Sequence, residues 1–159
     1  MQPDFVAAVL SGCQDQGIHT AVETTGACSW ENMARVAKYA DLVLLDIKLI
    51  DPELHLHWTG IPNQQILENA SRLADLDVQI RVPLIPDITD TTDNIRQICS
   101  FMQQTGLKHI ALLPYNASAG AKYEWLDLAY GIQGEPQTEA HLQDLIRIAH
   151  DAGLACEIV

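Results

Sequence analysis

The chain has 159 residues, a formal net charge of −12 at pH 7 and 48% hydrophobic residues, enough apolar content for one domain with one core and too much for a disordered chain. Nine Lys and Arg against 21 Asp and Glu argue against a nucleic-acid or anionic-membrane surface, because such surfaces need clustered cations. No apolar run approaches the ~20 residues that span a bilayer, and the first residues lack the pattern of a signal peptide, so we expect a cytoplasmic protein.

Helical apolar spacing alternates with short apolar runs along the chain. The helical spacing predicts helices over residues 3–16, 29–39, 51–59, 63–76, 91–104 and 137–152. The apolar and β-branched runs predict strands over residues 18–26, 41–50, 78–86 and 109–115, with a further apolar segment at 154–159. This alternation predicts an α/β fold with a parallel sheet of about four βα units.

The architecture of that sheet stays open between a doubly wound sheet and a (β/α) barrel. The GxGxxG motif that would favour a dinucleotide-binding doubly wound sheet is absent from the sequence. No linker or low-complexity segment interrupts the chain, so we expect residues 1–159 to form a single domain.

Cysteine and histidine spacing predicts no metal site. The four cysteines are widely scattered along the chain, at Cys13, Cys28, Cys99 and Cys156. His55 and His57 lie two residues apart in a predicted helix and therefore point to different faces. We expect free thiols packed as small apolar groups, and no catalytic nucleophile–base pair.

Polar side chains gather at the ends of the predicted strands, where parallel β/α folds bind their ligands. They are Glu23, Thr24, Asp46, Lys48, Arg81, Tyr115 and Asn116. The pattern places only Lys48, Arg81 and Lys122 of the nine cations on this side, and a small anionic ligand such as an α-carboxylate or a phosphate would explain them. The alternative is an internal ion-pair network, in which Lys48 pairs with Asp46 or Glu23 and Arg81 with either carboxylate.

Five segments of the sequence carry a family resemblance, in order and through nearly the whole chain. They are ETTG (23–26), LVLLDIK (42–48), DPELHLHWTGIPNQQIL (51–67), IRVPLIPDITD (80–90) and LLPYNASAGAKY (112–123). In these segments the chain resembles the glycyl-radical-enzyme activating enzymes, the pyruvate formate-lyase activase type of radical S-adenosylmethionine (SAM) proteins. The resemblance implies a partial parallel (β/α) barrel of the radical SAM type.

The resemblance also implies a set of cofactor-binding residues. Glu23 and Thr24 match the family's acidic-Thr segment, and Asp46 and Lys48 match its D-x-K segment at the end of the next strand. In the family these residues surround the aminoacyl part of SAM, and the acidic pair suits a monovalent cation beside its carboxylate.

Two further site residues come from the later strands. Arg81 matches the family's arginine on the following strand, and Asn116 matches a polar position that is more often His. An Asn there keeps hydrogen bonding but has no titratable role. A third group matches a family pattern that we interpret as structural: His55, Thr59, Gly60 and Asn63.

A complete activase carries a CxxxCxxC loop, whose thiolates hold a [4Fe-4S] cluster, and a GGE segment; this sequence has neither. The first strand here matches the family's third, so the resemblance implies that the first two strands are missing. We therefore expect the SAM-binding, C-terminal portion of an activase that generates a 5′-deoxyadenosyl radical to form a glycyl radical on a partner enzyme, inactive as this isolated chain. The implied partners are the glycyl radical enzyme and an electron donor such as flavodoxin or ferredoxin.

Two other functions remain open, a non-catalytic SAM- or partner-binding module and a Schiff-base (β/α) barrel lyase that uses Lys48. The loop from Asn116 to Gln137 carries Tyr123, Trp125 and Tyr130, and we interpret it as a lid or a docking surface, or as a loop that its aromatic residues anchor. The strand at 18–26 is expected at an exposed sheet edge, which favours dimerisation or poor solubility.

Overall fold

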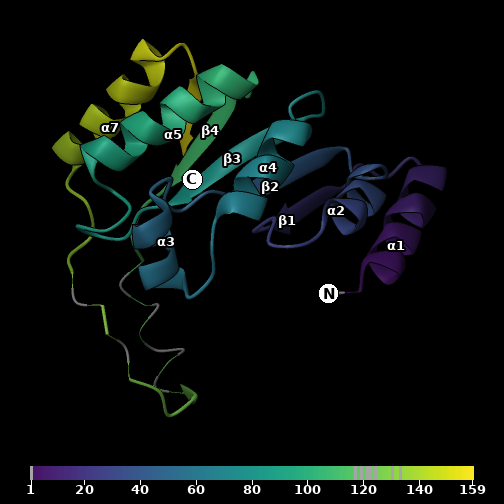
Figure 1. Cartoon of the computed structure of the whole chain (residues 1–159), viewed down its shortest axis with the longest axis horizontal. Helices are drawn as coiled ribbons and strands as arrows, with labels where there is room; N and C mark the ends of the chain where they lie inside the picture. The colour runs from purple at the N-terminus through teal and green to yellow at the C-terminus, as the bar shows by residue number, and fades with distance from the viewer. Residues whose placement is uncertain are drawn as a thin grey trace.

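The computed structural model describes residues 2–116, 118, 120, 123, 125–129, 131–132 and 134–159 (Figure 1). The helices are α1 (Pro3–Asp15), α2 (Trp30–Ala37), α3 (Pro52–Thr59), α4 (Gln64–Arg72), α5 (Thr92–Thr105) and α7 (Glu139–Asp151). The strands are β1 (Ala21–Thr24), β2 (Leu42–Asp46), β3 (Val78–Pro83), β4 (His109–Leu113) and β5 (Ala155–Ile158). Within these described ranges no helix is long and apolar enough to cross a membrane.

The apolar run predicted as one strand over 41–50 is a strand only as far as Asp46. Ile47 and Leu49 beyond it are almost completely buried, which explains why the apolar pattern continues. Ile47 N–H still donates to Arg81 O of β3, but the carbonyls of Lys48, Leu49 and Ile50 accept hydrogen bonds from asparagine side chains. The predicted strand end was therefore wrong, and Lys48 lies in the loop that follows β2.

The five strands form one sheet in the order β1-β2-β3-β4-β5, and every neighbouring pair is parallel. A doubly wound sheet reverses its strand order at a switch point, whereas a barrel adds each strand beside the last. The uninterrupted order decides between the two architectures. The prediction of a partial parallel (β/α) barrel with four βα units is confirmed, and β5 is added as a fifth strand.

The two faces of the sheet have opposite character. Helices α2, α4, α5 and α7 cover one face and bury the apolar residues of the strands; the largest fully buried strand residues are Leu45, Ile80, Ile110 and Leu112. The residues between them in the strands point to the other face and include Glu23, Asp46, Gln79, Arg81 and Glu157. This second face, which we call the open face, is the polar one, as expected of the inside of an incomplete barrel.

All four cysteines are free thiols on separate elements of the fold. Cys99 of α5 is a core residue, and Cys156 of β5 packs against the core. Burial raises the pKa of both thiols to about 11, so both are protonated at neutral pH. Among the described residues, no three His, Cys, Asp or Glu side chains lie close enough together to hold a metal ion.

Strand β1 lies at one edge of the sheet, and its outer backbone groups are therefore open to pairing. We expect the chain to dimerise through this edge, so that its apparent mass in size-exclusion chromatography with light scattering rises with loading concentration. Lys at the exposed position 21 (Ala21→Lys) should shift the chain toward monomer, because a charge on an edge strand disfavours pairing. The matched control, Ala155→Lys on the opposite edge strand, should leave the dimer intact. A monomeric unmodified chain at every concentration would contradict this expectation.

Candidate functional site

Three charged side chains share the open face near the carboxyl ends of β1, β2 and β3. Glu23 lies opposite Leu44 of β2, and Asp46, two residues further along β2, lies opposite Arg81 of β3. Paired residues of neighbouring parallel strands point to the same side, and so do residues two apart in one strand. The register therefore brings Glu23, Asp46 and Arg81 onto one surface.

These side chains and Lys48 form two ion pairs. Lys48 Nζ lies 3.1 Å from Asp46 Oδ2, and Arg81 Nη1 lies 2.6 Å from Glu23 Oε2, so that the Arg81 side chain reaches across β2 to β1. The side chains of Asp46 and Arg81 are 15% and 17% exposed, whereas that of Glu23 is 63% exposed. The ion pairs expected under the alternative interpretation are therefore present, and each cation is paired with one carboxylate.

One atom of this group is left without a partner. Oδ1 of Asp46 is buried and accepts no hydrogen bond from the described residues, and it is the only such buried side-chain atom among them. A buried acceptor without a donor costs roughly 1–3 kcal/mol, so native proteins rarely tolerate one. The two ion pairs leave Oδ1 without a partner. An ammonium group or a cation beside Asp46 would supply one.

The other two sequence-predicted site residues do not join this cluster. Thr24 lies opposite Leu45, so its side chain faces the helix-covered side, where its Oγ1 accepts a hydrogen bond of 3.1 Å from Gly26 N–H. Gly26 has a φ of +71°, and a Cβ there would lie 3.0 Å from Leu45 Cδ1, so the turn requires glycine. Asn116 follows β4, is exposed, and accepts a hydrogen bond from Ser118 N–H through its own Oδ1.

Three buried asparagines hold the loops around the cluster. Asn94 of α5 donates to Lys48 O (2.9 Å) and Thr89 O (2.8 Å). Asn69 of α4 donates to Gly26 O and Cys28 O. Asn63 donates to Leu49 O and Ile50 O. Sequence reasoning identified only Asn63 as structural; an amide within the apolar stripe of a predicted helix was the signal that could have identified the other two.

The remaining residues of that family pattern have local structural contacts. His55 is 3% exposed, and its Nδ1 lies 2.9 Å from Ile61 O and 3.0 Å from Thr59 Oγ1. Gly60 ends α3 with a left-handed φ of +76°. These contacts fit the structural interpretation of this segment.

The long loop after β4 is described only in part. Trp125 is 83% exposed, so this residue does not anchor the loop to the barrel. Tyr123 is 40% exposed. Lys122 and Tyr130, which the sequence placed on the ligand side and in the loop, lie outside the described residues.

An apolar hollow beside β1 shares one described lining residue, Glu23, with the charged cluster. Its lining includes Val6, Val22, Met33, Val36 and Val43, which come from α1, α2 and the first two strands. Val22 and Val43 point to the helix-covered side of the sheet, away from Asp46 and Arg81. The candidate site is therefore the charged cluster of Glu23, Asp46, Lys48 and Arg81 on the open face.

Comparison with known proteins gives several activating enzymes as relatives. No family model matches the chain. It is 37% identical over 166 residues to the 4-hydroxyphenylacetate decarboxylase activating enzyme of Clostridioides difficile strain CD196, covering 99% of this chain and 52% of the relative. It is 37% identical over 142 residues to the choline trimethylamine-lyase activating enzyme of Oleidesulfovibrio alaskensis, covering 86% of this chain and 46% of the relative. The chain thus spans about half the length of these curated relatives.

Solved structures with a similar fold include an activating-enzyme domain. A domain of the pyruvate-formate lyase-activating enzyme from Bacteroides vulgatus superposes with a TM-score of 0.82 at 31% identity, covering 99% of this chain and 91% of that one. SuiB of Streptococcus suis superposes with a TM-score of 0.75 at 15% identity, covering 96% of this chain and 35% of SuiB. The second likeness supports the fold alone.

Proposed function

The chain belongs to the glycyl-radical-enzyme activating enzymes, and on that premise we propose that its charged cluster binds the aminoacyl part of SAM. The observation that carries the proposal is Asp46 Oδ1, a buried carboxylate oxygen without a donor among the described residues. The α-ammonium group of SAM is a donor of the required charge. The cluster combines two carboxylates with two cations and therefore fits a ligand that carries both an ammonium and a carboxylate.

Each residue of the cluster has a role in this proposal. Asp46 accepts from the ammonium group, and Lys48 and Arg81 attract the carboxylate without leaving their acidic partners. Glu23 and Asp46 together offer carboxylate oxygens for a monovalent cation beside that carboxylate. Thr24 shapes the turn at Gly26, and the side-chain NH₂ of Asn116 donates a hydrogen bond to SAM from beyond the end of β4.

Glu23, Asp46, Lys48 and Arg81 would hold the aminoacyl group of SAM, which, given one electron from a reduced [4Fe-4S] cluster, would supply the radical chemistry that forms a glycyl radical on the partner enzyme. The part played by these residues is to bind and orient the aminoacyl group. The proposed partners are a glycyl radical enzyme and an electron donor such as flavodoxin or ferredoxin, and the proposed location is the cytoplasm.

We also propose that the isolated 159 residues bind SAM without performing the radical step. The four cysteines lie on α1, on α5, on β5 and between β1 and α2, which does not fit a site needing three neighbouring thiolates. This separation favours the second candidate function, a SAM-binding module, for the isolated chain. The Schiff-base lyase has no comparable support, because Lys48 Nζ is engaged in an ion pair with Asp46, whereas a Schiff-base amine has to be free to attack a carbonyl.

Calorimetric titration of the chain with SAM tests the proposal. We expect saturable binding of SAM, and binding at least about tenfold weaker for methylthioadenosine, which keeps the adenosine and lacks the aminoacyl group that the cluster would hold. The protein control is Glu53→Gln, which removes an exposed carboxylate of α3 and should bind SAM as tightly as the unmodified chain. Equal affinity for the two ligands, or no binding of SAM, would contradict the proposed site.

A further inference from the structure

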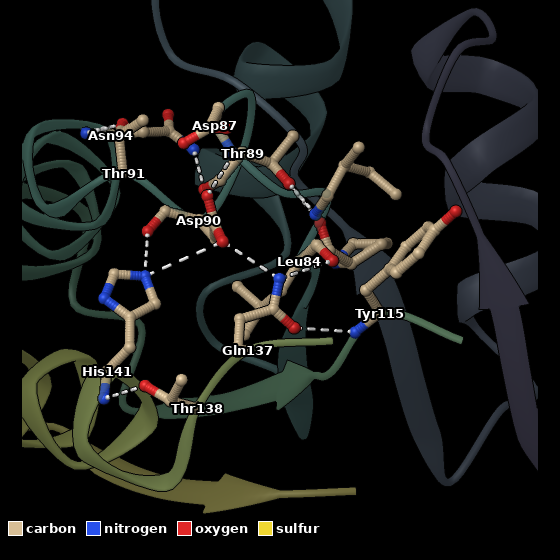
Figure 2. Close-up of polar contacts among 12 residues, drawn as sticks. Leu84, Asp87, Thr89, Asp90, Thr91, Asn94, Tyr115, Gln137, Thr138 and His141 are labelled. Atoms are coloured by element: carbon tan, nitrogen blue, oxygen red, sulfur yellow. Dashed lines mark hydrogen bonds and ion pairs between the residues drawn. The ribbon is translucent and has the colours of Figure 1, made fainter. Parts of the chain in front are cut away.

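The two ends of the long loop after β4 meet at one side chain, Gln137. Its Oε1 accepts a hydrogen bond of 2.8 Å from the backbone N–H of Tyr115, 22 residues earlier in the chain (Figure 2). Tyr115 follows β4 and is 8% exposed, and Asn116 is the next residue. Gln137 itself stands just before Thr138, the residue that caps the first turn of α7. The side chain thus ties the start of the loop to its end.

The other end of the Gln137 amide contacts the loop after β3. Its Nε2 donates to Asp90 Oδ2 over 2.9 Å, with Leu84 O a further acceptor at 3.3 Å. One carboxamide therefore connects the carboxyl ends of β3 and β4 with the beginning of α7. Figure 2 shows these contacts converging on Gln137 from Leu84 and Asp90 after β3 and from Tyr115 after β4.

Asp90 is itself held on several sides. It is 7% exposed, and its Oδ1 accepts from Asp87 N–H over 2.8 Å. Asp87 has a φ of +61°, a left-handed conformation that costs energy in a residue other than glycine and that this bond helps to stabilise. His141 of α7 lies 2.9 Å from Asp90 O through its Nε2. Asp90 is a fixed acceptor, and its position does not depend on Gln137 alone.

The pairing has a defined direction. A carboxylate only accepts hydrogen bonds and a backbone N–H only donates, so the amide of Gln137 must turn its NH₂ to Asp90 and its oxygen to Tyr115. From this geometry we propose that Asp90 and Gln137 form a clamp that sets the position of Tyr115–Asn116, and that both are positioning residues for the ligand contact of Asn116. Because only the proposed function places Asn116 at SAM, the ligand half of this proposal rests on that function.

A polarity exchange tests the clamp directly. In Gln137→Glu a second carboxylate faces Asp90, and in Asp90→Asn a second NH₂ group faces Gln137. In the double variant the introduced amide at position 90 donates to the introduced carboxylate at position 137, which still accepts from Tyr115 N–H, and the net charge equals that of the unmodified chain. The donor–acceptor match between positions 90 and 137 is therefore lost in each single variant and regained in the double variant. Two contacts are not restored, that of Leu84 O and that of His141 Nε2, which lies 3.6 Å from Asp90 Oδ2.

The measurement is amide hydrogen exchange by NMR. Each single variant should raise the exchange rate of Tyr115 N–H by about tenfold, and the double variant should return it to within about threefold of the unmodified chain. The N–H of Ile110, in the middle of β4, is the control and should keep its rate. Single variants that leave Tyr115 exchange unchanged, or a double variant no better protected than the singles, would overturn the clamp.

The proposed effect of the clamp on the ligand is tested by measuring SAM affinity in a double-mutant cycle of Gln137→Ala with Asn116→Ala. Gln137→Ala should weaken SAM binding about threefold to tenfold in the unmodified background and have no further effect once Asn116 is alanine. A purely structural role would weaken binding equally in both backgrounds, and that result would overturn the positioning role. If the unmodified chain binds no SAM, the proposed function and this ligand half both fail, while the exchange of Tyr115 still decides whether the clamp exists.

Discussion

Replacing Asn94 by alanine is expected to lower the free energy of unfolding by about 3 kcal/mol, the largest loss of stability that we anticipate from a polar substitution. Asn94 is 5% exposed, and its Nδ2 donates to both Lys48 O and Thr89 O. Alanine removes the donor of the buried Thr89 carbonyl and of the partly buried Lys48 carbonyl, and an unsatisfied buried acceptor costs roughly 1–3 kcal/mol. The loop that carries Lys48 would lose its tie to α5.

Urea denaturation of three variants separates hydrogen bonding from packing. Asn94→Asp keeps the size of the side chain but places a carboxylate against two carbonyls, so we expect it to be at least as destabilising as Asn94→Ala. Gln104→Ala, at an exposed position of the same helix, is the control and should change the free energy of unfolding by less than about 0.5 kcal/mol. An Asn94→Ala variant within about 1 kcal/mol of the unmodified chain would show that these bonds contribute little.

The second large effect concerns binding rather than stability. Asp46→Asn is expected to weaken SAM binding by about 10- to 100-fold, because hydrogen bonds to charged groups contribute roughly 1.5–3 kcal/mol. Asparagine keeps an oxygen for Lys48, so the 3.1 Å contact survives, but its NH₂ group would face the ligand's ammonium where Asp46 Oδ1 now lies. The amide also removes the negative charge that attracts the ammonium.

The stability of the same variant should change by less than about 1 kcal/mol, because the carboxylate oxygen that it replaces has no partner to lose among the described residues. Calorimetry and urea denaturation on one protein preparation measure both quantities. A variant that binds SAM like the unmodified chain would remove Asp46 from the site. A variant that loses binding only because it unfolds would show that Asp46 is structural.

Much of the fold was predictable because burial leaves a periodic trace in the sequence. The alternation of apolar runs and helical stripes predicted the parallel sheet, and Ser29, Thr91 and Gly106 marked helix ends as expected. The end of the second strand was not predictable, since Ile47 and Leu49 are buried without belonging to a strand. Apolar patterning reports burial, and strand pairing depends on the neighbouring segment.

The candidate site was predictable as a set of residues but not as a set of contacts. Strand spacing placed Asp46 and Lys48 on one side, and they do form an ion pair, although Lys48 lies in the loop after β2 rather than in the strand. The choice of Glu23 rather than Asp46 as the partner of Arg81 depends on the register of three strands, which a sequence pattern does not specify. Thr24 was expected at the site, but its side chain points to the covered face.

Contacts between distant segments were the least accessible to sequence reasoning. Asn94 lies 46 residues from Lys48, and Gln137 lies 47 residues from Asp90. Gln137 was predicted as the first residue of the last helix, whereas the helix begins at Glu139 with Thr138 as its cap. That shift of the helix start frees the Gln137 side chain to reach Tyr115 and Asp90.

The most direct test of the SAM site is an NMR titration of the isotopically labelled chain with SAM. We predict that the largest amide shift changes cluster at residues 23–28, 46–50 and 81–86, which carry or adjoin Glu23, Asp46, Lys48 and Arg81. The same titration with methylthioadenosine should leave the amides next to Asp46 and Arg81 unchanged. Shift changes confined to the apolar hollow between α1, α2 and β1, with none at residues 46–50 or 81–86, or no saturable change anywhere, would contradict the proposed site.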